Sequence, residues 1–298
     1  SQMAEGIAIS NSSVVVSVFH AGLVTTDNVF SRTPVWKGIP GGESQYNKGI
    51  AWEWTKTYAD PKRTNVFYVF GTRLVRRILG SGISTTNIVP IGNFRPQAIA
   101  VDSRPDHDII LSSCREPDPN IPHELVPKIK RTLEGNSDTP VWSDEIVDQI
   151  RRDESIISMA FAPSNLAMAY AVSDLGNVYR KTDVESSSSW QRMGQWNEPS
   201  VKQLVVNPEL SRRIYLLSNS KLAFSENAGG SFRLIHGSGR NSLPSNGELT
   251  SLVAYPFNPQ VLFVGSSVGI FVTTNDGASW FRFDHGLPNA VVTQILWH

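Results

Sequence analysis

Short apolar runs alternate with turns rich in Gly, Pro, Asn, Asp and Ser along almost the whole chain. Such runs are typical of strands, because β-branched and aromatic residues fit a pleated sheet and the turn residues end it. Helical periodicity is nearly absent, and only residues 122–133 and 143–155 carry a pattern compatible with a helix. The hydrophobic pattern therefore predicts an all-β fold.

The apolar runs also recur as a repeat. About six copies follow one another at intervals of roughly 50 residues, which is near the range of propeller blades. They begin near Gly6, Gly49, Ala98, Ile156, Val201 and Leu249. Each copy contains four strand-like runs, and stacking four-stranded sheets around an axis buries both of their apolar faces. The repeat predicts a β-propeller of four-stranded antiparallel blades.

The number of blades depends on the last residues. After the sixth copy the chain continues as "NAVVTQILWH", residues 289–298, which is similar to the first strand of a further copy. We expect six blades, with this tail closing against the N-terminal blade. Seven blades with the last one incomplete in this chain is the alternative. In either case we expect a single propeller domain over residues 1–298, with an irregular insertion at about 114–150.

Two copies carry the same polar turn at the same place. Its residues follow the pattern Ser/Thr-x-Asp/Asn-x-Gly-x-Ser/Thr-Trp/Phe. They are Ser225, Asn227, Gly229, Ser231 and Phe232 in one copy, and Thr273, Asn275, Gly277, Ser279 and Trp280 in the next. An Asn side chain can accept hydrogen bonds from nearby backbone N–H groups, and Gly supplies a positive φ. The aromatic residue can be buried between blades. We interpret these residues as structural.

This turn resembles the Asp-box, or bacterial neuraminidase repeat, of sialidase-like β-propellers. The resemblance implies that the turn joins the third and fourth strands of a blade and lies away from any active site. Other copies depart from the pattern. Thr25 and Asp27 begin an interrupted box, and Thr182 and Asp183 begin one that lacks the Gly.

Four residues are candidates for ligand binding. Trp52 and Trp54 flank Glu53 in the inner strand expected for the second copy, and two indoles beside a carboxylate would suit a sugar. Arg95 lies in Phe-Arg-Pro, which is similar to the Phe-Arg-Ile-Pro motif of sialidases, whose Arg binds the substrate carboxylate, although the Ile is missing. Trp297 in the tail completes the set.

The sequence assigns no catalytic residue. Glycosidases need two carboxyl groups that converge on the scissile bond. Asp102, Asp106 and Asp108 could offer such a pair, and Glu53 and Asp102 are the candidates for a catalytic role. The six His residues show no metal-ligand spacing, and no Gly-rich phosphate loop is present. We therefore expect neither a metal nor a cofactor.

The composition limits the classes of partner that are compatible with the sequence. The chain has 27 basic and 27 acidic residues, a balance that argues against a nucleic-acid binder. No apolar run approaches the roughly 20 residues of a membrane span, and no signal peptide is visible. The lone Cys114 excludes an intrachain disulfide but fits a cytosolic as well as a secreted bacterial protein, so the compartment stays open. Nothing in the sequence indicates an oligomeric state.

Three functions are compatible with these observations. The first is a non-catalytic recognition propeller that binds a glycan or a protein on one face of the ring. The second is a glycoside hydrolase similar to sialidases or xyloglucan-degrading enzymes, and the third is an assembly or scaffold factor. We favour recognition, because the catalytic groups expected of the enzymes are not visible in the sequence.

Overall fold

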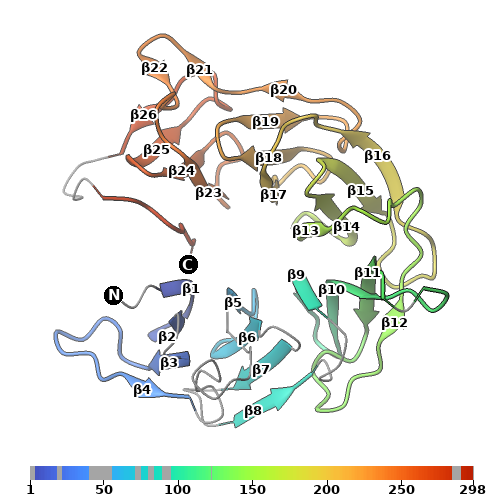
Figure 1. Cartoon of the computed structure of the whole chain (residues 1–298). Coiled ribbons are helices and arrows are strands. Elements are labelled where there is room, and N and C mark those ends of the chain that lie inside the picture. The colour runs from blue at the N-terminus through green and yellow to red at the C-terminus, as the bar shows by residue number, and fades with distance from the viewer. Residues whose placement is uncertain are drawn as a thin grey trace.

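The computed structural model describes residues 4–18, 22–39, 56–70, 75–79, 84–88, 95–121, 123–283 and 290–297. These residues form six sheets, each of four antiparallel strands in sequence order, arranged around a central axis (Figure 1). The predicted all-β propeller with six four-stranded blades is thereby confirmed. The described residues contain no helix, so none of them belongs to a helical membrane span.

Each blade runs from an inner strand beside the axis to a fourth strand at the rim (Figure 1). Blade 1 comprises β1 (Ala4–Ser10), β2 (Ser13–Val18), β3 (Gly22–Thr26) and β4 (Lys37–Gly38). Blade 2 comprises β5 (Lys56–Ala59), β6 (Val66–Phe70), β7 (Val75–Leu79) and β8 (Ser84–Asn87). Blade 3 comprises β9 (Arg95–Ser103), β10 (Asp108–Pro117), β11 (Leu125–Thr132) and β12 (Ser143–Asp144).

The C-terminal half repeats this arrangement. Blade 4 comprises β13 (Ile156–Ala162), β14 (Asn165–Ser173), β15 (Asn177–Lys181) and β16 (Gln191–Gln195). Blade 5 comprises β17 (Val201–Val206), β18 (Ile214–Ser218), β19 (Leu222–Ser225) and β20 (Arg233–Leu234). Blade 6 comprises β23 (Leu249–Ala254), β24 (Leu262–Ser266), β25 (Gly269–Thr273) and β26 (Phe281–Arg282). A two-stranded ribbon of β21 (Gly237–Ser238) and β22 (Asn241–Ser242) lies between blades 5 and 6.

The core lies between blades rather than in one central layer. Five apolar clusters join successive blades, from the pair of blades 1 and 2 to the pair of blades 5 and 6. The second strands of blades 2 to 5 have neighbouring blades on both faces, and every residue of β18 is buried. This double burial explains their nearly continuous apolar sequence, in contrast to the alternation of a half-exposed strand.

The stretch expected to be irregular, at about 114–150, contains regular strands. It includes the end of β10, all of β11 and β12. Residues 122–133, which carry a helix-compatible pattern, contribute β11, which pairs with β10 from Ile110 opposite Thr132 to Pro117 opposite Leu125. Residues 143–155 contribute β12 and turns. Strand pairing within blade 3 outweighs the local helical preference. The stretch supplies the third and fourth strands of the blade, β11 and β12, which pack beside neighbouring blades.

The polar turn of blade 6 is closed by its own side chains. Thr273 Oγ1 donates to Asn275 Oδ1 at 2.9 Å and accepts from Gly277 N at 3.0 Å. Asn275 Oδ1 also accepts from Ser279 N at 2.9 Å, and Asn275 Nδ2 donates to Ser279 Oγ at 2.9 Å. Gly277 has φ 79°, in the left-handed region that favours glycine. The hydrogen bonds explain why the residue types stand at fixed offsets.

The turn of blade 5 has the same set of bonds. Ser225 Oγ donates to Asn227 Oδ1 at 2.9 Å and accepts from Gly229 N at 2.9 Å. Asn227 Oδ1 accepts from Ser231 N at 2.9 Å, and its Nδ2 donates to Ser231 Oγ at 3.0 Å. Phe232, the last residue of the pattern, packs at the edge of the cluster between blades 4 and 5. The two turns are therefore local structures that recur with the blade repeat.

Blade 1 contains a related turn that begins one residue later than the sequence pattern suggests. Thr26 Oγ1 donates to Asn28 Oδ1 at 2.7 Å, and Asn28 Oδ1 accepts from Val35 N at 3.1 Å. The strand register explains the shift, because Thr26 lies opposite Val14 as Thr273 lies opposite Leu262. Thr26 and Asn28 thus replace Thr25 and Asp27 as the first polar residues of this turn.

Tryptophans directly before fourth strands bond one blade to the next. In three blades the indole N–H donates to the residue that follows the fourth strand of the preceding blade. The pairs are Trp142 with Ile88 O at 2.8 Å, Trp190 with Glu145 Oε2 at 3.2 Å, and Trp280 with Ile235 O at 2.8 Å. Trp190 and Trp280 are fully buried, so each contributes apolar area as well as a hydrogen bond between blades.

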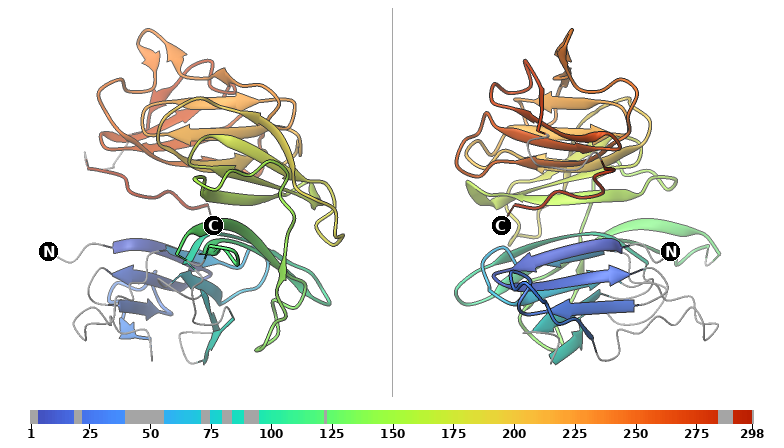
Figure 2. Two further views of the ribbon diagram at one scale, coloured as in Figure 1. Left: turned by 45° about the vertical axis from the view of Figure 1, so that its right-hand side comes forward. Right: turned by 90° about the vertical axis from the view of Figure 1, so that its left-hand side faces the viewer.

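Residues 290–297 run between blade 6 and blade 1, as the face-on and side views both show (Figures 1 and 2). Ile295 N donates to Ser251 Oγ of β23 at 3.0 Å. Ile7 N of β1 donates to Gln294 Oε1 at 3.2 Å. The tail therefore contacts the N-terminal blade, as expected from the six-blade arrangement.

Candidate functional site

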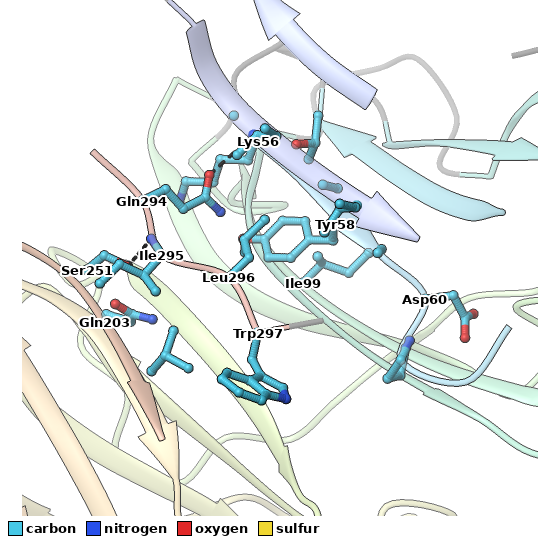
Figure 3. A pocket seen from close by; sticks show the side chains of 18 of the residues that line it. Lys56, Tyr58, Asp60, Ile99, Gln203, Ser251, Gln294, Ile295, Leu296 and Trp297 are labelled. Carbon is cyan, nitrogen blue, oxygen red and sulfur yellow. Dashed lines mark hydrogen bonds between the residues drawn. The ribbon is translucent and has the colours of Figure 1, made fainter. Parts of the chain in front are cut away.

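The inner strands enclose a cavity of about 1200 Å³ on the propeller axis. Residues from β1, β5, β9, β13, β17 and β23 line it, and the tail passes along one side (Figure 3). Much of the lining is apolar, including Ile7, Tyr58, Ile99, Leu204 and Leu296. Concave, mostly apolar sites with a few polar groups are the usual form of ligand pockets. The cavity is therefore the candidate site.

Lys56 supplies a positive charge to the wall of this cavity. Its Nζ donates to Gln97 O at 3.2 Å, and no described carboxylate lies within ion-pair distance of it. The side chain keeps access to solvent through the channel, but the surrounding protein excludes much of the bulk water and lowers the pKa of Lys56. A ligand carboxylate would find a cation here that needs no displacement of an existing ion pair.

Tyr58 provides an apolar surface two residues further along β5. Burial raises its pKa to about 12, so the phenol is neutral at physiological pH. Its ring packs edge-on against Phe70 with centroids 5.7 Å apart. This contact fixes the ring on the cavity wall, where Figure 3 shows it between Lys56 and Ile99.

Several polar side chains of the wall join one inner strand to the next. Gln203 Oε1 accepts from Leu252 N at 2.8 Å, and its Nε2 donates to Leu252 O at 2.9 Å. Ser158 Oγ accepts from Leu204 N at 3.1 Å. These groups hold the ring together, which leaves Lys56 as the charged group of the wall with the fewest partners among the described residues.

The acidic group of the lining is also engaged. Asp60 Oδ1 accepts from the backbone N–H groups of Lys62 at 2.9 Å and Arg63 at 2.8 Å. Its Oδ2 accepts from Ser103 Oγ at 2.5 Å and Tyr68 OH at 3.3 Å. With both oxygens bonded, Asp60 organises the loop between β5 and β6 and joins it to β9.

Asp102 lies behind the wall and not on it. The residue is 1% exposed and pairs with Lys62 Nζ at 2.9 Å and Arg104 Nε at 2.8 Å. Asp108, also buried, pairs with Arg63 at 2.8 Å, and burial raises its pKa. These carboxylates belong to a charged junction between blades 2 and 3, so the structure does not bring Asp102 to the cavity as a catalytic acid.

The other sequence-predicted residues are distributed unevenly. Trp52, Glu53 and Trp54 lie outside the described residues. Arg95 begins β9, and the structure describes only its backbone, which lies opposite Arg115. Trp297 alone among the described ligand candidates reaches the cavity, where it lines one mouth (Figure 3).

Two further aromatic residues, Tyr255 and Phe257, extend the apolar surface beside Trp297. Trp297 packs edge-on against Tyr255 with centroids 4.6 Å apart, and Tyr255 packs against Phe257 at 5.5 Å. Trp297 is 47% exposed and Phe257 is 75% exposed. Sequence reasoning missed Lys56, Tyr58 and these two aromatic residues. The repeat could have pointed to Tyr255 and Phe257, because both lie within three residues of the end of the inner strand β23.

Neither thiol chemistry nor metal binding has support in the described part of the chain. Cys114 is buried, and burial raises the pKa of its thiol, so it remains protonated and inaccessible. No group of three or more His, Cys, Asp or Glu residues is placed to hold a metal ion among the residues that the structure describes.

Comparison with known proteins shows that this chain resembles solved structures in its fold. No family model matches the chain, and no curated protein matches its sequence. Solved structures do match. A structure of YCF48 bound to D1 peptide has a TM-score of 0.61 and 13% identity, covering 96% of this chain and 85% of that one. YCF48 from Cyanidioschyzon merolae has a TM-score of 0.64 and 11% identity, covering 98% and 87%.

The GH74 xyloglucanase from Xanthomonas campestris is also similar, with a TM-score of 0.53 and 11% identity. The match covers 93% of this chain but about half, 52%, of that enzyme. The fold is that of a β-propeller. At these identities the likeness extends to the fold alone, and function has to be argued from the site.

Proposed function

We propose that this protein is a non-catalytic recognition propeller that binds an extended polypeptide segment in its central channel. The observation that carries this proposal is the axial cavity of about 1200 Å³, in which Lys56 stands without a carboxylate partner among the described residues on a largely apolar wall. A bound segment would place apolar side chains against Tyr58 and Ile99 and a carboxylate near Lys56 Nζ.

Binding is favoured over hydrolysis because the described acids are already committed. A glycosidase needs one carboxyl group as an acid and a second as a base or nucleophile. Asp60 has both oxygens hydrogen-bonded by the protein, and Asp102 is buried in ion pairs behind the wall. Neither group is free to face a scissile bond.

A polypeptide is favoured over a glycan because polar side chains of the wall already bond to neighbouring strands. Sugar recognition requires many free hydrogen-bonding side chains, yet Gln203 and Ser158 are used to connect inner strands. The exposed Trp297 of the lining, with Phe257 nearby, can cover apolar peptide side chains. The likeness to YCF48, solved with a bound D1 peptide, is consistent with this choice.

We also propose that the turns of blades 5 and 6 are Asp-boxes in the sense of the sialidase-like propellers. Identical bonds around Asn227 and Asn275 support this assignment. Their residues do not line the cavity, which agrees with a structural role in the blade.

The proposal can be tested with an array of random linear peptides, probed in parallel with a glycan array and a panel of chromogenic glycosides. We expect binding to peptides that carry a carboxylate among apolar residues, no binding to glycans and no turnover. In titrations with a selected peptide, Lys56→Glu is expected to weaken binding about tenfold, since it replaces an attraction with a repulsion.

Lys37→Glu is the matched control. Lys37 is an exposed residue of β4 at the rim, so the same charge change there should leave the affinity unaltered. Equal losses in both variants would show a general charge effect and contradict the channel site. Binding confined to the glycan array, or turnover of any glycoside, would overturn the proposal in favour of a carbohydrate ligand or an enzyme.

A further inference from the structure

The loop between β5 and β6, residues 60–65, separates the cavity from the charged junction of blades 2 and 3. Residues 60–64 line the cavity, whereas Asp102 and Asp108 lie behind them. Asp60 directly follows β5, so the loop stands at the end of this strand away from Lys56 (Figure 3). A change in the junction can therefore alter the cavity wall at this end.

The three buried carboxylates of the junction are held unequally. Asp60 accepts four hydrogen bonds, and Asp102 pairs with two cations. Asp108 is 0% exposed and pairs with Arg63 at 2.8 Å. Among the described residues, no donor gives either oxygen of Asp108 a hydrogen bond in good geometry. A buried carboxylate with so few partners is costly to keep ionised.

The groups around Asp108 favour its neutral form. The charged and titratable side chains that face it are Arg63 and Asp60 of the loop, Tyr68 of β6 and Arg77 of β7. The nearby hydroxyl of Ser103 donates to Asp60 Oδ2 at 2.5 Å. Burial raises the pKa of Asp108 above the ordinary Asp range, Arg63 opposes this shift, and the charge of Asp60 adds to it.

A proton on Asp108 removes the charge that holds Arg63 in the junction. The Arg63 side chain is 35% exposed and lines the cavity. Among the described residues, its other side-chain bond runs from Nη2 to Arg104 O at 3.3 Å, which is long for a hydrogen bond. Its backbone N–H stays bonded to Asp60 Oδ1 at 2.8 Å. The guanidinium can therefore move while the loop backbone keeps its place.

The fold tolerates this proton. An acid whose pKa is raised in the folded state binds its proton more tightly there than in the unfolded chain, so its contribution to stability falls as the pH rises through the folded pKa. Protonation of Asp108 on acidification therefore does not lower the free energy of unfolding. The pair with Arg63 can open at acidic pH while the ring stays intact.

We propose that protonation of Asp108 releases Arg63 from the junction and lets its guanidinium turn into the channel as a second cation for the ligand. This inference rests on the proposed function, in which the ligand is an extended polypeptide segment. Lys56 holds a carboxylate at one end of β5, and the released Arg63 attracts one at the other end. Acidification thus strengthens the binding of segments that carry acidic residues toward both ends.

Two measurements test the release of Arg63 without any ligand. In carbon-13 NMR of the carboxyl groups, assigned with Asp108→Asn, the signal of Asp108 should titrate at higher pH than that of Asp106. A hydrogen bond with His107 lowers the pKa of Asp106. Phenylglyoxal, which modifies accessible guanidinium groups, should react with Arg63 about threefold faster in Asp108→Asn than in the unmodified protein, because asparagine imitates the protonated acid. Mass spectrometry identifies the modified residue.

The ligand test uses a peptide selected for channel binding and extended by one glutamate at each end. Its affinity is measured at neutral pH and at the acidic pH where the NMR titration finds Asp108 protonated. The gain on acidification should be about threefold larger in the unmodified protein than in Asp108→Asn or Arg63→Gln. The pKa of Lys56 is lowered by burial, but Lys56 is present in all three proteins, so its own protonation does not affect the comparison.

Asp106→Asn is the matched control. It removes the same charge from the same turn, but Asp106 is 81% exposed and pairs with His107 at 2.9 Å instead of Arg63. This variant should keep the full gain on acidification and the unmodified rate of the phenylglyoxal reaction at Arg63. An equal loss of the gain in both Asn variants would show a general charge effect and overturn the proposal.

The remaining outcomes distinguish this inference from the proposed function. If Asp108 titrates no higher than Asp106, or if Arg63 reacts equally fast in Asp108→Asn, the release of Arg63 is wrong whether or not a peptide binds. If both measurements succeed but no peptide binds, the proposed function fails, and with it the role of Arg63 toward a peptide, while the release itself stands. Equal gains in Asp108→Asn and the unmodified protein would overturn Arg63 as a second anchor.

Discussion

Blades 5 and 6 have the same construction but different surroundings. Their second and third strands align residue by residue, because Leu217 lies opposite Leu222 as Gly265 lies opposite Ile270. In blade 5, Leu222 is fully buried against blade 6. Its counterpart Ile270, on the face beside the tail, is only partly buried.

The same contrast holds at the neighbouring position. Phe224 of blade 5 is 1% exposed, whereas its counterpart Val272 of blade 6 is partly exposed. The polar turns that follow these residues nevertheless have identical hydrogen bonds. The hydrogen bonds within the turn therefore recur from blade to blade, whereas burial on a blade's face depends on what stands next to it. Comparing aligned residues separates these two contributions.

The largest expected effect comes from truncating Leu222. Leu222→Ala removes fully buried atoms between two blades and should lower the free energy of unfolding by about 3 kcal/mol. Ile270→Ala, its aligned partner, should cost only about 1 kcal/mol because its side chain is already partly solvated. Urea unfolding followed by circular dichroism measures both. Equal losses would show that the face of blade 6 is as well packed as that of blade 5.

The turns should respond equally, in contrast to the faces. Asn227→Ala and Asn275→Ala each remove the same set of hydrogen bonds, so each should cost about 1 to 2 kcal/mol. Replacement by Asp in either turn keeps the accepting oxygens and loses one donor, and should cost less. The same unfolding assay applies. A clear difference between the two Ala variants would mean that neighbouring blades also support the turn.

These contrasts explain how much the sequence could predict. The blade, its four strands and its polar turn arise from residues close together in the chain, so the repeat around Asn227 and Asn275 was sufficient to predict a propeller. The turn of blade 1 was assigned one residue too early because the pairing of Thr26 with Val14 depends on strand register, which the local pattern does not fix.

The candidate site was harder to predict because residues from different blades create it. Lys56 and Tyr58 are unremarkable in the sequence, and only the closure of the ring places them on one wall with Ile99 and Leu296. Asp102 has the composition of a catalytic candidate, but its partners Lys62 and Arg104 come from two blades and remove it from the cavity. Trp297 was predicted as a ligand residue and does line the mouth, although its binding role remains a prediction.

The smallest expected effect concerns the bonds between inner strands, and it tests the tail directly. Ser158→Ala leaves the N–H of the buried Leu204 without its acceptor and should cost about 1 kcal/mol of unfolding free energy. Ser251→Ala removes the same kind of bond from Ile295, but the exposed tail can hydrogen-bond to water instead. Its unfolding free energy should stay within about 0.5 kcal/mol of the unmodified protein. Hydrogen exchange in residues 292–297 should accelerate, because the tail loses one of its anchors to blade 6. Unchanged exchange there, or a loss of stability as large as that of Ser158→Ala, would mean that the tail is packed into the ring as firmly as the inner strands of the complete blades.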